Sequence, residues 1–402
     1  MSPVNGLSSA TRPAVVRELI EDFASSAAAR DAAGGTAKRE RDLIRRSGLL
    51  SLTIPADLGG AGGDLNEALT ITRRIAAVDS SLAHLFAFHH LMLTSLRLYG
   101  PKEQWAPLFE RTARASLFWG NALNPRDTRT RIEPGAREGE YIVSGTKSFC
   151  SGAADSDMLI VSAHTQGDSK LVVAAVPTDR PGIRINDDWN NIGQRQTDSG
   201  TVSFEHLVVY ESEILRHPGP LGSTFAGLRS CFAQLILCNI YAGLAEGALA
   251  EASRHVNEHV RPSTPVQAAS PSSTSQAADD PYVLRHFGEY LVLARSASAL
   301  TDLAQAAFQS AFNLGDSLEP ARRAEVAIAI ATAKVAGARA ALDVSSRIFE
   351  VLGARATDAK LRLDRFWRNA RTHTLHDPID YKLQELGAWA LRGKPPTPGF
   401  YS

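Results

Sequence analysis

The chain has 402 residues with 43 basic and 43 acidic side chains, so its formal net charge is zero. A neutral chain lacks the basic excess that favours nucleic acid or an anionic membrane surface as a partner, and we therefore expect a small-molecule partner. The length predicts two or three domains. Only three cysteines occur and no basic start followed by an apolar run opens the chain, so we expect a soluble cytoplasmic protein without a membrane span.

Residues 1–114 are predicted to form an N-terminal helical domain. Apolar residues recur at three- and four-residue spacing in Val15–Ile20 and Asp42–Leu50, as they do on one face of a helix. Two further helices are expected over Asn66–Ala77 and Ser80–Tyr99.

The pattern changes at Ala115 to short β-branched runs separated by glycine, aspartate, asparagine and proline. We expect a central β-domain over residues 115–215. Because no helix of about 10 to 15 residues separates the runs, we expect antiparallel strands and no βαβ unit. The runs are Leu117–Gly120, Tyr141–Gly145, Met158–Ala163, Lys170–Val176 and Thr201–Val209.

Residues 216–402 return to a helical pattern that is rich in alanine. Small side chains let helices pack closely, so a C-terminal four-helix bundle is predicted. Cys231 and Cys238 fall on one of these helices, where they cannot form a disulfide without breaking it. Residues 261–281 are rich in serine and proline, and we expect this loop to be either disordered or a lid over a ligand.

The segment Arg365–Pro378 carries the clearest chemical signal, because it combines arginines with His373, His376 and Asp377. If the segment is helical, the two imidazoles share a face. Proline then ends the helix beside these titratable groups, where side chains can face a cleft. A charged surface helix that ends in a histidine is an equally good interpretation of the segment alone.

The order of helices, small β-domain and helical bundle resembles the acyl-CoA dehydrogenase superfamily. Arg368–Pro378 resembles its catalytic segment, in which a glutamate removes the substrate's α-proton; here Asp377 stands at the carboxylate position and His376 replaces a tyrosine. Lys147–Gly152 resembles the segment along the flavin, and Gly193–Ser199 resembles a characteristic turn. The resemblance implies an acyl-CoA dehydrogenase-like fold, mainly α with a central β-domain.

Further motifs resemble more narrowly the flavin-dependent monooxygenases of the dibenzothiophene desulfurisation type. This resemblance implies that a separate NAD(P)H-dependent flavin reductase supplies reduced FMN, which reacts with O₂ to a flavin C4a-hydroperoxide. The hydroperoxide then oxygenates a sulfur or nitrogen centre of a small, aromatic or hydrophobic substrate. The enzyme is expected to be a homotetramer. The motifs are Phe118–Ala122, Phe149–Ala153, Asn186–Gly200, Gly353–Ala356, Thr372–Pro378 and Pro398–Ser402.

The same resemblance assigns the site residues. His89 and His376 are expected to hydrogen-bond the flavin peroxide as neutral imidazoles, with Asn121 and Ser151 beside the flavin ring, and these four are the expected catalytic residues. Arg261 is expected to reach the cofactor phosphate of a neighbouring subunit. The full set of expected cofactor contacts is Asn121, Lys147, Phe149, Cys150, Ser151, Trp189, Ser199, Arg261, Ala354, Arg355 and His376.

Other interpretations stay open. The chain could be an FAD-dependent acyl-CoA dehydrogenase with Asp377 as base, although aspartate is one methylene shorter than glutamate and Pro378 restricts it. It could also be a catalytically silent flavin-binding scaffold. Without the resemblance, His89 in mid-helix would be a core histidine, and Lys147 and Trp189 would be a solvated charge and ordinary core.

Two kinds of site are not expected. His84, His89 and His90 are clustered but do not share one helix face, and no cysteine or acid completes a metal-binding set. Gly59–Gly63 follows no strand and is predicted to be a turn, so the chain has no evident nicotinamide-binding loop. An external reductase agrees with this expectation.

Overall fold

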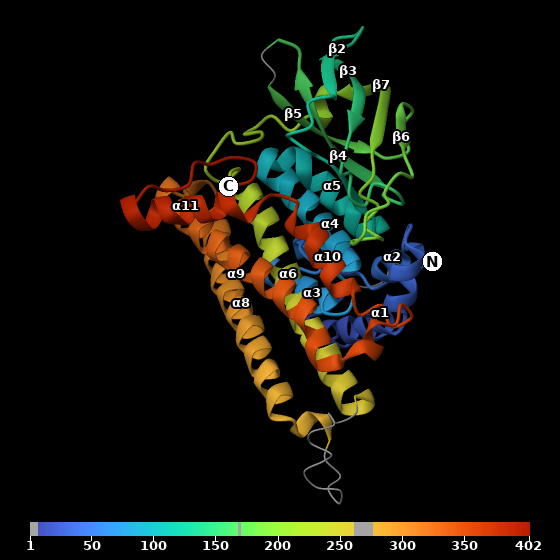
Figure 1. Cartoon of the computed structure of the whole chain (residues 1–402). Coiled ribbons are helices and arrows are strands. Elements are labelled where there is room, and N and C mark those ends of the chain that lie inside the picture. Colours follow the sequence, from blue (N-terminus) through green and yellow to red (C-terminus); the bar gives the residue numbers. More distant parts are fainter. Residues whose placement is uncertain (1–6, 168–169, 261–275) are drawn as a thin grey trace, which may run out of the picture.

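The structure, a computed structural model, describes residues 7–167, 170–260 and 276–402, and places the sheet at one end of the molecule with the helices below it (Figure 1). The elements follow the expected order of helices, strands and helices. The helices are α1 (Arg12–Ala33), α2 (Lys38–Arg46), α3 (Leu65–Ala76), α4 (Ser80–Tyr99), α5 (Lys102–Ala115), α6 (Leu228–His259), α8 (Pro281–Asn313), α9 (Pro320–Leu352), α10 (Arg365–Thr374) and α11 (Ile379–Arg392). The strands are β1 (Trp119–Ala122), β2 (Arg131–Pro134), β3 (Glu140–Lys147), β4 (Met158–Thr165), β5 (Leu171–Pro177), β6 (Ile183–Ile185) and β7 (Val202–Tyr210).

Helix α4 connects the three parts of the molecule. Asp79 caps its first turn by accepting hydrogen bonds from the backbone N–H groups of Ser81 and Leu82, at 2.9 and 3.1 Å. All of its residues except Arg97 are buried, because α3, α6 and β1 pack around it. A helix that is buried on every side has no polar face, so its sequence does not reveal which side chains point toward a site.

The sheet is mostly antiparallel, as expected, but two of its pairings are parallel. Its order is β1-β4-β2-β3-β7-β6, with β5 on the other edge of β4. Strand β4 runs parallel to both β1 and β2. This is possible because β2 and β3 lie between β1 and β4 in the chain and supply the long connection that a parallel pair needs. The short strands β2 and β6 were not predicted.

The C-terminal helices form the bundle through close contacts of α6 with α8, α9 and α3. At Gly247 a Cβ atom would lie 2.0 Å from the backbone oxygen of Ala77, so only glycine permits this approach of α6 to the end of α3. Helix α6 is the one described helix that is long and apolar enough to cross a membrane, but 83% of its most apolar window is buried inside the protein, as in a core helix. The three cysteines are buried and unpaired.

The segment with His373 and His376 is not one continuous helix. Helix α10 ends at Thr374, and His376 lies in the turn before α11. Pro378 explains the break, since the residue before a proline is disfavoured in helical conformation. The two imidazoles therefore do not share a helix face.

The predicted lid and the predicted domain limits concern the joints of the chain. Residues 261–275 of the expected lid lie outside the described residues, whereas Ala277–Asp279 form a 3₁₀ turn before α8. We propose the domain limits 1–114, 115–215 and 216–402, because they fall at the joints between the helical parts and the sheet.

Candidate active site

A cavity of about 700 Å³ lies where α4, α10 and the loops of the β-domain meet. It brings together residues from most of the motifs found in the sequence, although none from Gly353–Ala356. Its lining residues are His84, Phe88, Asn121, Leu123, Asn124, Arg126, Phe149, Ser151, Trp189, Asn190, Asn191, Ile192, Gln194, Thr197, Ser199, Arg371, Thr372, His373, Leu375, His376 and Tyr401.

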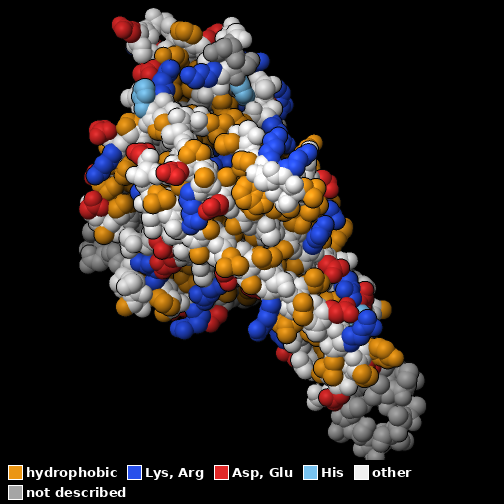
Figure 2. Space-filling model, turned by 90° about the vertical axis from the view of Figure 1, so that its left-hand side faces the viewer, with side chains coloured by type: hydrophobic (Ala, Val, Ile, Leu, Met, Phe, Trp, Pro, Cys, Tyr) orange, Lys and Arg blue, Asp and Glu red, His pale blue; other side chains and the backbone are white. Residues whose placement is uncertain are grey.

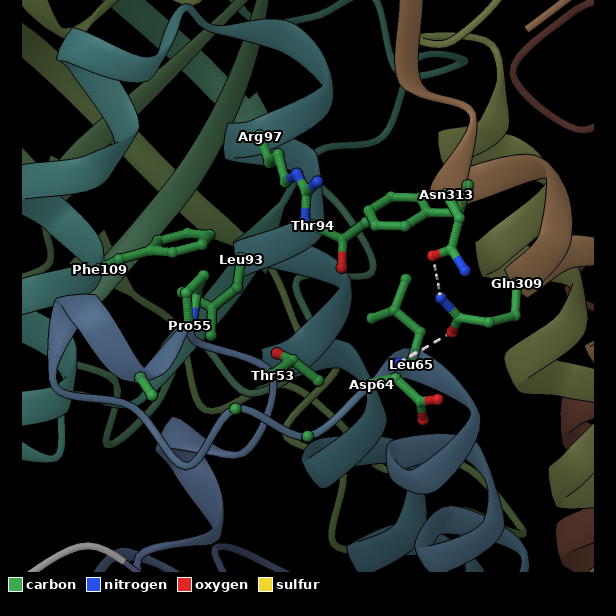
Figure 3. A pocket seen from close by; sticks show the side chains of 14 residues that line it. Thr53, Pro55, Asp64, Leu65, Leu93, Thr94, Arg97, Phe109, Gln309 and Asn313 are labelled. Atoms are coloured by element: carbon green, nitrogen blue, oxygen red, sulfur yellow. Dashed lines mark hydrogen bonds between the residues drawn. The ribbon is translucent and has the colours of Figure 1, made fainter.

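A second cavity, of about 390 Å³, lies between α4 and the end of α8 (Figure 3). No histidine lines it in the part of the chain that the structure describes, and the Gln309 and Asn313 amides bond within the protein. Gln309 accepts from the backbone N–H of Leu65 at 3.1 Å and donates to Asn313 at 2.8 Å. The first cavity is therefore the better candidate for chemistry.

The structure places some of the expected site residues in the first cavity and others outside it. Arg261 lies outside the described residues. His89, Lys147, Cys150, Ala354 and Arg355 do not line the cavity. Those that do line it are Asn121, Phe149, Ser151, Trp189, Ser199 and His376.

Three hydroxyl groups form a chain on the sheet side of the cavity. The Ser151 hydroxyl lies 2.8 Å from that of Ser199, which lies 2.7 Å from that of Thr197. The backbone N–H of Asn121 donates to the Ser151 carbonyl at 3.0 Å, which fixes the end of β1 against this chain. Such a row of hydroxyls can donate and accept hydrogen bonds without carrying a charge.

The loop of residues 186–200 docks on α10 and lines the cavity with Trp189 and Ile192 together with several polar side chains. A Cβ atom at Gly193 would lie 2.1 Å from the Arg368 backbone oxygen, so the approach requires glycine. The Gln194 N–H then donates to Asn369 at 2.6 Å, and the indole of Trp189 donates to the Gln194 carbonyl at 2.8 Å. This bonding presents the Trp189 ring to the cavity.

A pair of histidines from two distant segments lies at the α4 side of the cavity. Nδ1 of His84 lies 2.8 Å from Nε2 of His373, and the His84 ring stacks on Phe88 with 3.8 Å between ring centres. Burial lowers the pKa of His84 well below its usual value and that of His373 to about 3. Both rings are therefore neutral at neutral pH, and one donates its proton to the other.

The remaining nitrogens of this pair have no internal partner. Nε2 of His84, Nδ1 of His373, the hydroxyl of Thr372 and Oε1 of Gln194 are buried without a hydrogen-bond partner among the described residues. Unsatisfied buried polar atoms are costly, so their gathering at one cavity indicates a ligand that completes their hydrogen bonds.

His89 occupies a different place. Its Nε2–H donates to the Leu50 carbonyl at 2.8 Å, and its Nδ1 accepts from the backbone N–H of Trp119 at 3.2 Å. Burial lowers its pKa to about 4. Both nitrogens thus join α4 to the preceding 3₁₀ turn Leu49–Ser51 and to β1, and the expected contact with flavin would require one of these bonds to break.

Lys147 and Cys150 do not line the cavity themselves, but they belong to the segment whose Phe149 and Ser151 line it. The fully buried ammonium of Lys147 donates to the Asp127 and Asn124 carbonyls at 2.6 and 3.3 Å, and burial lowers its pKa to about 8. Burial also raises the pKa of the Cys150 thiol to about 12, so this cysteine is unreactive. Lys147 is therefore not a solvated charge, and it fixes the loop after β1.

Asp377 is buried below the cavity in an ion pair. Its carboxylate is 4% exposed; Lys334 donates to one oxygen at 2.5 Å, and Nδ1 of His376 lies 3.0 Å from the other. Gln234 also binds the Lys334 ammonium. Burial raises the pKa of Asp377, but the His376 hydrogen bond and the Lys334 charge outweigh burial and hold the pKa below its usual value. This geometry contradicts the alternative in which Asp377 is a dehydrogenase base.

Several residues of the cavity were not identified from the sequence. His84 was considered only as a metal ligand and was set aside because it does not share a helix face with His89; its contact with His373 joins residues 289 positions apart. The one local signal is the spacing of His84 and Phe88, which places both on one side of the helix. Other lining side chains that were not among the expected site residues include Phe88, Arg126, Gln194, Thr197, Arg371, Thr372, His373 and Tyr401.

Comparisons with known proteins match the fold and sequence over nearly the whole chain. Models of the acyl-CoA dehydrogenase N-terminal, middle and C-terminal domains match residues 10–116, 122–207 and 235–381. A probable FMNH2-dependent monooxygenase, SfnC of Pseudomonas putida, is 50% identical over 404 residues, which is 100% of both chains.

Two solved structures are similar in sequence and in fold. The methanesulfinate monooxygenase MsuC from Pseudomonas fluorescens is 51% identical with a TM-score of 0.93, over 96% of this chain and 98% of that one. FMN-bound TdsC from Paenibacillus sp. A11-2, a dibenzothiophene monooxygenase, is 38% identical with a TM-score of 0.91, over 97% and 100% of the two chains.

Proposed function

The chain belongs to the acyl-CoA dehydrogenase family, and we propose that within this family it is a monooxygenase that uses reduced FMN and O₂ to oxygenate a sulfur centre of a small molecule. The observation that carries this function is the absence of a carboxylate among the described residues of the cavity lining. Asp377, which holds the place of the dehydrogenase base, is paired with Lys334 and covered. The cavity is lined instead by imidazole and hydroxyl side chains.

The cavity fits a flavin. Its volume of about 700 Å³ suits a cofactor-sized ligand. Phe149 is 61% exposed toward it and meets Trp189 edge to face at 6.3 Å between ring centres, which gives an aromatic wall. The unpartnered atoms of His84, Gln194 and Thr372 supply polar contacts.

When bound, FMN supplies the redox chemistry and activates O₂, and the protein orients it and excludes water. Asn121, Ser151 and Ser199 would hold the flavin through polar contacts, and Phe149 and Trp189 would hold it through aromatic contacts. Cys150 supplies backbone only, because its thiol donates to the Lys147 carbonyl at 3.2 Å.

We assign the hydrogen bonds at the reacting oxygen to His84, His373 and His376. The first two form a neutral pair that can present a donor at one end and an acceptor at the other. His376 is held by Asp377 through Nδ1, which leaves Nε2 for the ligand. His89 was expected in this role, and His84, five residues earlier on α4, meets the requirement for an unpartnered nitrogen.

A homotetramer would complete the cofactor site. Arg355 is exposed and makes no ion pair with any described residue, so it is available to a neighbouring subunit's phosphate, as was expected of Arg261. The face of α8 and α11 carries exposed hydrophobic side chains suited to subunit contacts (Figure 2). Among them are Leu291, Val292, Leu303 and Leu391.

A separate NAD(P)H-dependent flavin reductase completes the proposed system, because the relative SfnC is named for its use of FMNH2. We also propose a cytoplasmic location, which agrees with three unpaired cysteines.

Isotope labelling tests the function. The purified protein is given reduced FMN from any flavin reductase, a sulfur compound and ¹⁸O₂. We expect one ¹⁸O atom in the product and none from labelled water. Reduction of an electron acceptor with an acyl-CoA, without O₂, would instead show a dehydrogenase.

A further inference from the structure

The second cavity, of about 390 Å³, lies on the side of α4 that faces away from the candidate active site. His84 and Phe88 line the first cavity, whereas Leu93 and Arg97 line the second. His84 and Leu93 are nine residues apart, as are Phe88 and Arg97. Nine residues make about two and a half helical turns, so the two pairs point in opposite directions. The second cavity is therefore a separate site.

Arg97 brings a positive charge to this cavity, and it is the one exposed residue of α4. No hydrogen bond or ion pair joins its guanidinium to a residue that the structure describes, and the guanidinium carbon lies 4.8 Å from the centre of the Phe312 ring. Burial lowers the pKa of Arg97, but an arginine keeps its proton in a protein. Arg73 on α3, in contrast, pairs with Asp302 at 2.7 Å. The charge of Arg97 is thus available to a ligand.

The single carboxylate among the described lining residues does not neutralise Arg97. It belongs to Asp64, which caps α3 by accepting a hydrogen bond from the backbone N–H of Glu67 at 2.8 Å. Figure 3 shows Asp64 on the far side of Leu65 from Arg97. The two ends of the cavity therefore differ in charge, and the Arg97 end is positive.

The neutral polar groups near Arg97 leave donors free and not acceptors. The Thr94 hydroxyl donates to the His90 carbonyl at 2.7 Å. Oδ1 of Asn313 accepts from Gln309 at 2.8 Å, and the amide NH₂ of Asn313 bonds to none of the described residues. A guanidinium and an amide NH₂ together suit a ligand that accepts hydrogen bonds and carries negative charge.

The remaining walls of the cavity are apolar. Phe312, on which the Arg97 guanidinium stacks, is itself fixed between Phe225 and Phe308, at 5.4 and 6.0 Å between ring centres. The volume is at the low end for small-molecule sites, so a ligand must be small. The apolar lining residues are Pro55, Leu65, Leu93, Phe109 and Phe312.

We propose that the second cavity binds a small amphipathic carboxylate, with its head group on the Arg97 guanidinium and the Asn313 amide and its hydrocarbon body against Leu93 and Phe109. The guanidinium can present two parallel N–H donors to the two carboxylate oxygens. Its stacking on Phe312 limits its rotamers, so less side-chain freedom is lost when the ligand binds. This binding is separate from the proposed oxygenation and does not depend on it.

Octanoate and its neutral analogue octanamide test the role of the charge by calorimetry. Wild type should bind octanoate about 10-fold more tightly than octanamide, as expected for a charge-assisted hydrogen bond. Arg97→Gln should bind octanoate about 10-fold more weakly than wild type and octanamide within about twofold of it. Arg17→Gln is the matched control, because Arg17 is exposed, lies outside the lining and forms no ion pair with the described residues. Equal affinity of wild type for both probes, or unchanged octanoate binding by Arg97→Gln, would overturn the proposal.

The length of the probe tests the apolar walls. Hexanoate, heptanoate and octanoate carry the same head group, and each added methylene should tighten binding to wild type about three- to fourfold. The same series should tighten binding to Arg97→Gln by the same factors, because the walls are intact in that variant. An affinity that does not change with length would show an ion held at the surface and would contradict the proposed site.

Two further measurements separate this site from the other possible locations of the probe. Octanoate should bind wild type equally with and without saturating FMN, because the two cavities share no lining residue. Loss of octanoate binding in the presence of FMN would place the probe in the first cavity and overturn the proposal. Light scattering should give Arg97→Gln the same mass as wild type. A changed number of subunits would instead show that a second copy of the chain covers the second cavity, which also overturns it.

Discussion

Helix α4 carries two buried histidines that differ in one respect. His84 and His89 are 4% and 0% exposed, and burial lowers the pKa of both. His89 has a backbone partner at each nitrogen, whereas His84 keeps one nitrogen without a partner and lies on the cavity. Residue type and burial therefore do not identify a functional histidine; an unused hydrogen-bonding atom beside a cavity does.

The same difference separates two cations near the cavity. Lys334 is fully buried and paired with Asp377, whereas Arg371 lines the cavity and pairs with no described residue. Side chains that have hydrogen-bond or ionic partners inside the protein should contribute to its stability. Side chains without such partners should contribute to ligand binding. Substitutions on the two sides test this division.

The largest effect is expected for Lys334→Met. The variant leaves the Asp377 carboxylate buried without its cation, which should lower the free energy of unfolding by about 3–5 kcal/mol. Arg371→Gln, the matched control with no partner to lose, should stay within about 0.5 kcal/mol of wild type. Urea unfolding followed by circular dichroism measures both.

The double variant Lys334→Met/Asp377→Asn examines the reason for that loss. Removing both charges should restore more than half of the lost stability, because no unpaired ion remains. A double variant no more stable than the single one would show that packing around the Lys334 side chain, and not charge pairing, causes the effect.

His89→Ala should follow with a loss of about 3 kcal/mol, since two buried backbone groups lose their partner and a cavity opens. Urea unfolding measures this loss as well. Product formed per folded molecule should stay within about twofold of wild type. If the folded variant instead releases hydrogen peroxide in place of product, the original prediction of a catalytic His89 is right and the division proposed here is wrong.

The sequence predicted the three-part layout well and the site in part. Three of the predicted residues line the cavity because local backbone structure positions them: Ser151 follows β3, Ser199 precedes β7, and Trp189 lies in the loop that Gly193 lets dock on α10. Their position follows from short-range structure.

The histidines could not be assigned in this way. The partner of His84 lies 289 residues away, and no periodicity marks the cavity side of a helix that is buried all around. His373 and His376 do not share the helix face predicted for them, because α10 ends between the two residues. The long-range contact between His84 and His373 and the end of α10 therefore determine how the histidines lie at the cavity, and the sequence pattern shows neither feature.

His84→Ala should affect chemistry more than folding. Product formation should fall about 100-fold, about 2.7 kcal/mol, with reduced FMN still oxidised and hydrogen peroxide released instead. Oxygen consumption and product are measured together. The stability loss should be smaller than for His89→Ala, because the pocket nitrogen had no internal partner. Full coupling in the variant would remove His84 from the proposed site.

The smallest effect concerns pH. The pKa of His89 is about 4 in the folded protein, below the usual 6.5, so the unfolded chain binds more protons between these values. Its contribution to stability is therefore complete above about pH 6.5 and is lost as the pH falls toward 4. Lowering the pH from 7 to 5.5 should cost wild type about 1 kcal/mol more than it costs His89→Gln, measured by urea unfolding at both values. Trp119→Phe, which loses the indole hydrogen bond to Thr112 but no titratable group, should keep the wild-type dependence. Equal pH dependence in wild type and His89→Gln would mean that His89 takes up its proton as readily in the folded state as in the unfolded one, which is the behaviour of a ring facing a water-filled cavity and not of one bonded at both nitrogens.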